Sequence, residues 1–232
     1  MPAVVGIDLA AGRGITEVAV LIAEAGSCPV FDAASHRRVA TDAEIVAVVS
    51  AAQPAVLAID APLTLPRAVM RGLAGGADVG ALPAAPTDAS AGDSPYTRAA
   101  EHDPIWATLS IRPLPISFLG GLTFRAITLV PRLRAAAPLA DIIEVFPSAT
   151  LRQLSITQSA AGGKATKTTE ASRKLVQRGL RQYIEGVASP EHKLYGADLL
   201  DALAAALTAV AYLRGEYLTI GDPEEGAIIL LS

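Results

Sequence analysis

The chain has 232 residues, of which 51% are hydrophobic, 18% are charged and 4% are aromatic. This composition predicts a globular domain whose large core is built of aliphatic residues and alanine, and it excludes an intrinsically disordered chain. The formal net charge of −4 argues against a strongly basic protein that binds any nucleic acid through charge alone.

The single cysteine, Cys28, excludes an internal disulfide and a zinc site made of cysteines. The N-terminal residues lack the basic start and apolar run of a signal peptide, and no uncharged apolar run reaches the roughly 18 residues that span a membrane. We therefore expect a cytoplasmic protein without a membrane segment, whose plausible metals are those that bind oxygen ligands.

The first part of the chain predicts paired strands followed by a helix. Ala3–Asp8 and Thr16–Ala23 are apolar, β-branched runs separated by a glycine-containing turn, which indicates a hairpin. A third strand is expected between Val30 and Val39. Thr41 and Glu44 have the spacing of a capping box, so a helix should begin there and continue to about residue 52.

The middle of the chain combines a strand with a long irregular segment. Pro54–Asp60 predicts the next strand, and the prolines that follow it predict a sharp exit from the sheet. Residues 72–96 are rich in Gly, Ala, Pro, Ser and Asp. We expect one domain over 1–232 with a flexible insertion at about 72–112, which is a candidate lid over a site.

The second half predicts helices around one more central strand. Helices are expected over Phe118–Ala137, Glu170–Glu185 and Ala197–Gly215, and strands over Asp141–Phe146 and Ala227–Leu231. An early hairpin followed by strand–helix crossovers predicts an α/β fold with a mixed β-sheet and helices on both faces.

Two carboxylates follow buried strands at matching positions. Asp8 ends the run Val4–Asp8, and Asp60 ends the run Val56–Asp60. Ligands of α/β sheets bind beyond the carboxyl ends of the strands, so we expect the two side chains to converge. Two close carboxylates repel, and Mg²⁺ or Mn²⁺ would relieve that repulsion. The alternative is that each aspartate caps the turn that follows it.

Three further acids are candidate metal ligands. Glu144 lies inside an apolar strand, where a charge needs either a ligand or an ion-pair partner. Asp198 and Asp201 are spaced i, i+3 and therefore share one face of the last long helix. Asp198 has the alternative role of a helix cap, whereas Asp201 lies past the first turn.

Cations gather in the second half of the chain. Between Arg112 and Gln182 there are eleven Lys and Arg residues and three acids. This excess indicates either solvated helix faces or a basic surface for a phosphate backbone. Arg98 is a candidate for binding the phosphate or carboxylate of a substrate, as is Lys193 or its neighbour His192; the alternative is a surface or structural role.

Four segments resemble, in the same order, the family called domain of unknown function 429, which is described as predicted nucleases with a ribonuclease H-like fold. They are Val5–Asp8, Ala58–Leu63, Ile143–Pro147 and Asp198–Leu203, and the final Gly226–Ile229 is similar as well. The resemblance implies a metal-dependent phosphodiester hydrolase that acts on nucleic acid or a nucleotide. It implies catalytic Mg²⁺ or Mn²⁺ ligands at Asp8, Asp60, Glu144 and Asp201. From its spacing to Asp201, Asp198 is a further candidate ligand.

Two other functions remain open. An ATP-dependent phosphotransferase of the actin and sugar-kinase fold also begins with a strand that ends in Gly-x-Asp, and Gly12 and Gly14 would admit phosphates close to the backbone. No second Asp-x-Gly-Thr turn supports it. The other possibility is a non-catalytic module that retains the fold and uses the apolar helix at 199–213 as a homodimer interface. ATP binding and metal titration separate the three.

Overall fold

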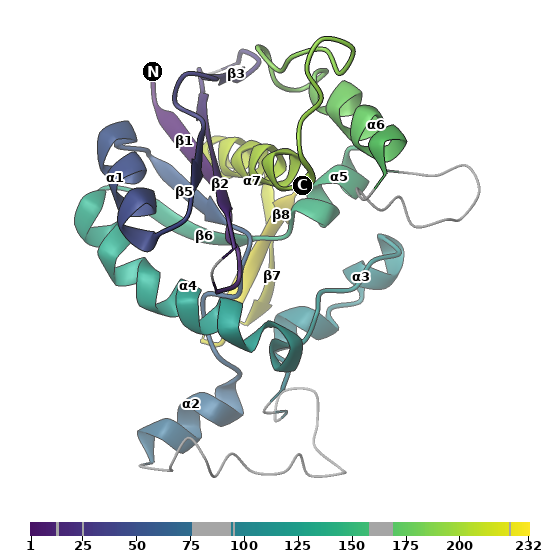
Figure 1. Cartoon of the computed structure of the whole chain (residues 1–232). Coiled ribbons are helices and arrows are strands. Elements are labelled where there is room, and N and C mark those ends of the chain that lie inside the picture. Colours follow the sequence, from purple (N-terminus) through teal and green to yellow (C-terminus); the bar gives the residue numbers. More distant parts are fainter. Residues whose placement is uncertain (13, 25, 76–93, 95, 158–168, 223) are drawn as a thin grey trace.

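The structure is a computed structural model that describes residues 1–12, 14–24, 26–75, 94, 96–157, 169–222 and 224–232. One mixed β-sheet forms its centre (Figure 1), with the strand order β3-β2-β1-β5-β6-β8-β7 and β4 paired to β2. The strands are β1 (Ala3–Asp8), β2 (Thr16–Ile22), β3 (Val30–Phe31), β4 (Arg37–Val39), β5 (Val56–Ile59), β6 (Asp141–Val145), β7 (Tyr217–Asp222) and β8 (Gly226–Leu231).

The strands β1, β5, β6 and β8 run parallel, while the β1–β2 and β7–β8 pairs are antiparallel. The helices are α1 (Asp42–Ala52), α2 (Arg67–Ala74), the 3₁₀ helix η3 (Ala99–His102), α3 (Ile105–Thr108), α4 (Ile116–Ala136), α5 (Pro147–Gln153), α6 (Glu170–Leu180) and α7 (Ala197–Arg214). The predicted mixed sheet with helices on both faces is therefore confirmed.

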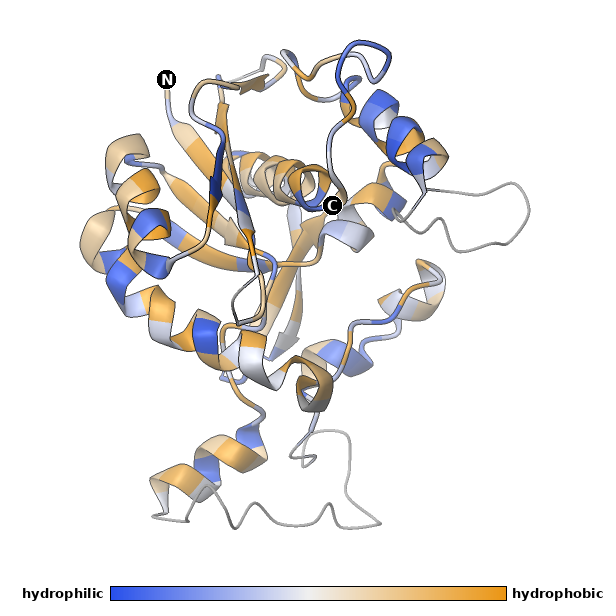
Figure 2. Ribbon diagram, viewed as in Figure 1, coloured by the Kyte–Doolittle hydropathy of each residue, from blue (hydrophilic) through white to orange (hydrophobic). Residues whose placement is uncertain are grey.

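Two hydrophobic cores lie on the two faces of the sheet. One core joins the sheet to α5, α6 and α7, and the other joins it to α1 and α4. Figure 2 shows that the strands and α7 are mainly hydrophobic, whereas α6 is mostly hydrophilic. Because α7 is buried along most of its length, this helix belongs to the core, and it is not a free surface for a homodimer.

The closest approach between α7 and the sheet is at Gly6 of β1. A Cβ atom at this position would lie 2.1 Å from the carbonyl oxygen of Ala202 and 2.3 Å from the amide nitrogen of Ala206. Only a residue without a side chain lets the helix backbone come so near the strand. This contact sets the position of α7 over β1, two residues before Asp8.

Several local predictions are confirmed and others are wrong. Thr41 and Glu44 form the expected capping box of α1. The single strand expected over Val30–Val39 is instead two short strands, because Asp32 accepts hydrogen bonds from Ala34 and Ser35 and turns the chain. Pro147 does end a strand, but it also begins α5, where its missing N–H costs nothing.

Of the expected insertion at 72–112, residues 76–93 and 95 lie outside the described residues. The described part beyond them contains η3 and α3, and the side chains of Arg98 and Trp106 are buried there. No helix in the described ranges is both long enough and apolar enough to cross a bilayer.

Candidate functional site

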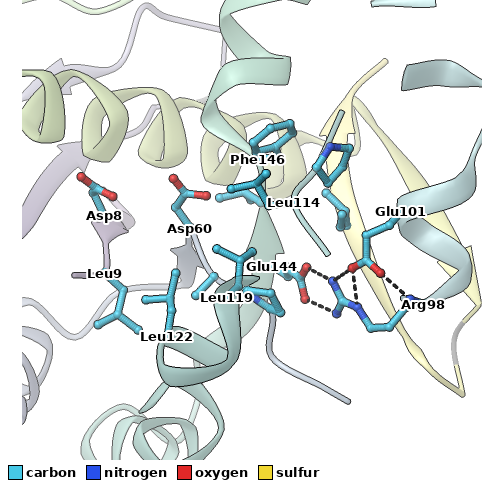
Figure 3. A pocket seen from close by; sticks show the side chains of 15 residues that line it. Asp8, Leu9, Asp60, Arg98, Glu101, Leu114, Leu119, Leu122, Glu144 and Phe146 are labelled. Atoms are coloured by element: carbon cyan, nitrogen blue, oxygen red, sulfur yellow. Dashed lines mark hydrogen bonds and ion pairs between the residues drawn. The ribbon is translucent and has the colours of Figure 1, made fainter. Parts of the chain in front are cut away.

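A pocket of about 220 Å³ lies where β1, β5 and β6 end (Figure 3). Its charged lining consists of Asp8, Asp60, Arg98, Glu101 and Glu144, which come from three strand ends and from the segment around η3. The other lining residues are apolar, among them Leu119, Leu122 and Phe146. The pocket therefore places several charges inside a largely hydrophobic wall, where electrostatic interactions are stronger than in water.

Asp8 and Asp60 come together in this pocket. β1 and β5 are parallel neighbours, and Ile7 is paired with Ile59, so the two aspartates occupy the next position along each strand direction. Figure 3 shows their side chains next to each other, pointing to the side of the sheet that α7 covers. Both are half-buried. The strand-end positions seen in the sequence thus correspond to adjacent positions in space.

Glu144 leaves the sheet on the opposite side. It is paired with Ile59, one residue before Asp60, and successive side chains of a strand point to opposite faces. Its carboxylate accepts hydrogen bonds from the backbone of Leu63 at 2.9 Å and from the guanidinium of Arg98 at 2.7 and 2.5 Å. A role for Glu144 as a metal ligand would require this ion pair to open.

Arg98 is the centre of a buried charge network. Its side chain is 1% exposed, and it also donates to Glu101 Oε1 at 2.8 Å and to Thr64 Oγ1 at 3.0 Å. Burial lowers the pKa of the guanidinium, but the hydrogen bonds and negative charges of Glu144 and Glu101 outweigh burial and hold that pKa above its ordinary value. The single positive charge of Arg98 thus balances only one of the two carboxylates. Its guanidinium nitrogens already donate to Glu144, Glu101 and Thr64, so none of them is available to a substrate phosphate.

Glu101 and Glu225 complete the support of this network. Burial raises the pKa of Glu101 above its ordinary value, with Arg98 acting in the opposite direction. The carboxylate of Glu225, which is 2% exposed, accepts from the amide of Arg67 at 2.6 Å and from the amide of Ala99 at 2.7 Å. Glu225 therefore ties the start of α2 and the start of η3 to the β7–β8 turn, and it positions Arg98.

The remaining predicted site residues do not line the pocket. Asp198 is exposed in the first turn of α7, and Asp201 is half-buried one turn later. Lys193 is exposed, with its Nζ 5.7 Å from the centre of the Tyr195 ring, and His192 is exposed beside it. Within the described residues, no three or more His, Cys, Asp or Glu side chains are already arranged to hold a metal ion.

Sequence reasoning missed Glu101, Thr64 and Glu225 as members of this site. Glu101 follows Arg98 at i, i+3, and this spacing was a usable local signal for an ion pair. Thr64 and Glu225 have no such signal, because their partners are distant in sequence. Chemically, the site offers the adjacent carboxylates of Asp8 and Asp60, whose oxygens can bind a metal ion. The neighbouring ion pair of Arg98 and Glu144 fixes the turn after β5.

Two structures of RuvC are among the solved structures that are similar to this chain. T. thermophilus RuvC in complex with a Holliday junction substrate has a TM-score of 0.50 and 14% sequence identity, over 93% of this chain and 96% of that chain. A second Thermus thermophilus RuvC structure has a TM-score of 0.42 and 14% identity, over 92% and 96% of the two chains. At this identity the first likeness shows the fold, a ribonuclease H-like α/β fold, and nothing further.

Comparison with curated proteins gives no match. The profile of the family described as "protein of unknown function (DUF429)" matches residues 6–226, which is nearly the whole sequence. The chain therefore belongs to the DUF429 family.

Proposed function

We propose that this protein is a metal-dependent nuclease, which hydrolyses phosphodiester bonds at the pocket that contains Asp8 and Asp60. The observation that carries the proposal is that these two carboxylates, 52 residues apart in the printed sequence, line one pocket at the ends of neighbouring parallel strands. Similarity of fold to RuvC, which was solved with a Holliday junction substrate, supports nucleic acid as the partner.

The donor set of the pocket fits a hard divalent cation. Asp8 and Asp60 present oxygen ligands, and Mg²⁺ or Mn²⁺ prefers carboxylate oxygen and water. When bound, such an ion polarises a phosphoryl oxygen and acidifies water for attack on phosphorus. We include Asp201 as a third ligand, because the residue after it, Ala202, contacts β1 two residues before Asp8. Asp198, one turn earlier, is the further ligand of the proposal.

The protein residues around the two aspartates would orient the substrate and exclude water. Leu119, Leu122 and Phe146 form the apolar wall, which keeps bulk water from the reacting phosphate. Glu144 and Arg98 hold the backbone of Leu63 in the turn that follows Asp60, so we assign both as positioning residues. Lys193, exposed before α7, is a proposed contact to the phosphates of the partner.

The location and assembly of the protein are also part of the proposal. We propose a cytoplasmic location, because the thiol of Cys28 is free and exposed and thiols stay reduced in the cytosol. A homodimer stays a prediction, to be checked by light scattering.

Cleavage assays on labelled DNA and RNA, each with Mg²⁺, Mn²⁺ or EDTA, test the hydrolase. Asp8→Asn and Asp60→Asn should each reduce the cleavage rate by more than the roughly 10- to 100-fold that the loss of an outer-shell partner costs. The matched control is Asp141→Asn, an exposed aspartate at the opposite end of β6, which should cleave at the wild-type rate. Wild-type activity in either pocket variant contradicts the proposal.

Mn²⁺ titration distinguishes the roles of the five acids, which are Asp8, Asp60, Asp198 and Asp201 as proposed ligands and Glu144 as a positioning residue. Replacement of an aspartate that binds the metal should abolish the Mn²⁺ binding measured by calorimetry. Glu144→Gln, which changes a positioning residue, should instead weaken Mn²⁺ binding by about 10- to 100-fold. ATP binding without cleavage of any nucleic acid would favour the phosphotransferase. Absence of binding to metal and to ATP would favour a non-catalytic module.

A further inference from the structure

A second cavity, of about 660 Å³, adjoins the acidic pocket. The two share three wall residues, Pro113, Leu114 and Phe146, so the second cavity, which residues of α3 and α5 also line, borders the first at these residues. Phe146 is half-buried and is packed edge-on against Trp106, with the ring centres 5.8 Å apart. A chain molecule bound at Asp8 and Asp60 that continues past Phe146 would reach the second cavity.

The charges of the second cavity are the reverse of those in the first. Among the residues that the structure describes, its lining contains Arg112 and Arg152 and no acidic residue. Neither guanidinium has a hydrogen-bond or ion-pair partner among the described residues, whereas Arg67, Arg98, Arg125 and Arg178 each bind a carboxylate. In a chain with a net charge of −4, two unpaired arginines in one cavity indicate a site for an anion.

The neutral lining of this cavity suits a phosphate joined to a sugar or a base. Ser110, Ser148 and Thr157 contribute hydroxyl groups, and arginine, serine and threonine are common donors to phosphate oxygens. Trp106 is not a donor here, because its Nε1 donates to the carbonyl of Ala100 at 2.6 Å. Ile111, Leu114 and Phe146 leave an apolar surface beside the arginines.

We propose that this second cavity binds the phosphate next to the one that is cleaved, and that the substrate is therefore a polynucleotide strand rather than a mononucleotide or a simple phosphate ester. This inference rests on the proposed hydrolase function, because it takes the acidic pocket as the reaction centre. A strand presents consecutive phosphates, so it can occupy both cavities at once. A nucleoside monophosphate has one phosphate group and can occupy only one of them.

Binding and cleavage should be measured separately. Fluorescence anisotropy of labelled single-stranded DNA and RNA oligonucleotides, in EDTA and at a series of KCl concentrations, reports binding without cleavage. Arg112→Ala and Arg152→Ala should each weaken binding about tenfold. Each should also reduce the slope of log Kd against log salt by about 0.7, the contribution of one single-strand phosphate contact. Thermal melts should show that both variants stay folded.

Arg181→Ala is the matched control, because Arg181 is an exposed arginine at the end of α6 that does not line either cavity. It should bind with the wild-type affinity and slope. A 5′-mononucleotide should displace the oligonucleotide at least tenfold less well than an unlabelled oligonucleotide does. Equal displacement would overturn the assignment to a strand, and so would wild-type affinity and slope in both cavity variants.

The outcomes separate this inference from the hydrolase proposal. Arginine-dependent binding of a strand, with no cleavage in Mg²⁺ or Mn²⁺, would reject the hydrolase and leave the phosphate site in place. Metal-dependent cleavage at the wild-type rate in Arg112→Ala and Arg152→Ala, without loss of affinity, would reject the phosphate site and leave the hydrolase in place.

Discussion

Arg98 binds both carboxylate oxygens of Glu144 through the two terminal nitrogens of its guanidinium, and the two side chains are 1% and 5% exposed. This planar, two-point contact is the geometry in which arginine binds a carboxylate most strongly. Because Glu101 shares the same guanidinium, the network contains two carboxylates and one cation. Its stability therefore depends on Arg98 more than on either acid alone.

Replacement of Arg98 by methionine should destabilise the protein by about 3–5 kcal/mol, because Glu144 and Glu101 would remain buried without their cation. The double variant Arg98→Met/Glu144→Leu should cost less than the sum of the two single changes, since it removes both halves of the pair. Urea unfolding measures all three. Arg71→Met, at an exposed position of α2, is the control and should change stability by less than about 0.5 kcal/mol. Strict additivity would contradict a coupled pair.

Glu225 should stabilise the same region from the β7–β8 turn. Glu225→Gln places an amide N–H₂ against one of two backbone donors, Arg67 N or Ala99 N, and should cost about 2 kcal/mol. Hydrogen exchange at those two amides should accelerate. The adjacent Glu224, whose side chain is 84% exposed, provides the control Glu224→Gln, which should leave both exchange rates unchanged. Equal effects of the two substitutions would show that Glu225 does not hold the two segments.

Replacement by alanine should have opposite effects at two glycines, Gly6 in the contact between β1 and α7 and Gly120 in α4. Gly6→Ala would place a methyl group against helix backbone atoms that cannot move independently, and it should cost about 3 kcal/mol or more. Gly120→Ala, inside α4 with no atom within 4 Å of the added Cβ, should instead stabilise the protein by about 0.5–1 kcal/mol. Denaturant unfolding compares the two. A mild effect at Gly6 would mean that α7 can shift away from β1.

Local patterns were sufficient to predict much of this fold. The strands before Asp8 and Asp60 were predicted because each is a short apolar run with a carboxylate at its end, and α1 was predicted from its capping box. The short helix α5 and the edge strand β7 were missed. α5 begins at a proline that reads equally well as a stop, and β7 exposes several of its residues, which weakens the apolar pattern.

The site was less predictable, because its pairs depend on the path of the whole chain. The partners Arg98 and Glu144 are 46 residues apart, and Ala99 and Glu225 are 126 residues apart. The strand run around Glu144 indicated that the acid needs a partner, but it could not distinguish a metal from an arginine. Strand alternation decides the question in part, since the carboxylate leaves the sheet on the face opposite Asp8 and Asp60.

The network also predicts a pH dependence of stability that can be traced to Glu101. Burial raises the pKa of Glu101 in the folded chain above its unfolded value, so the folded state keeps the proton to higher pH. Its contribution to stability is fully present below the ordinary glutamate pKa of about 4.3 and is lost as pH rises through the raised folded value.

Glu101→Gln removes this titration. The free energy of unfolding of the wild type minus that of Glu101→Gln should therefore decrease as the pH rises above the ordinary glutamate pKa of about 4.3, because the folded wild type then loses the proton that burial holds on Glu101. Urea unfolding of both proteins at several pH values measures this difference. A difference that grows with pH would mean that the ion pair with Arg98 outweighs burial, and that the pKa of Glu101 is lowered in the folded protein.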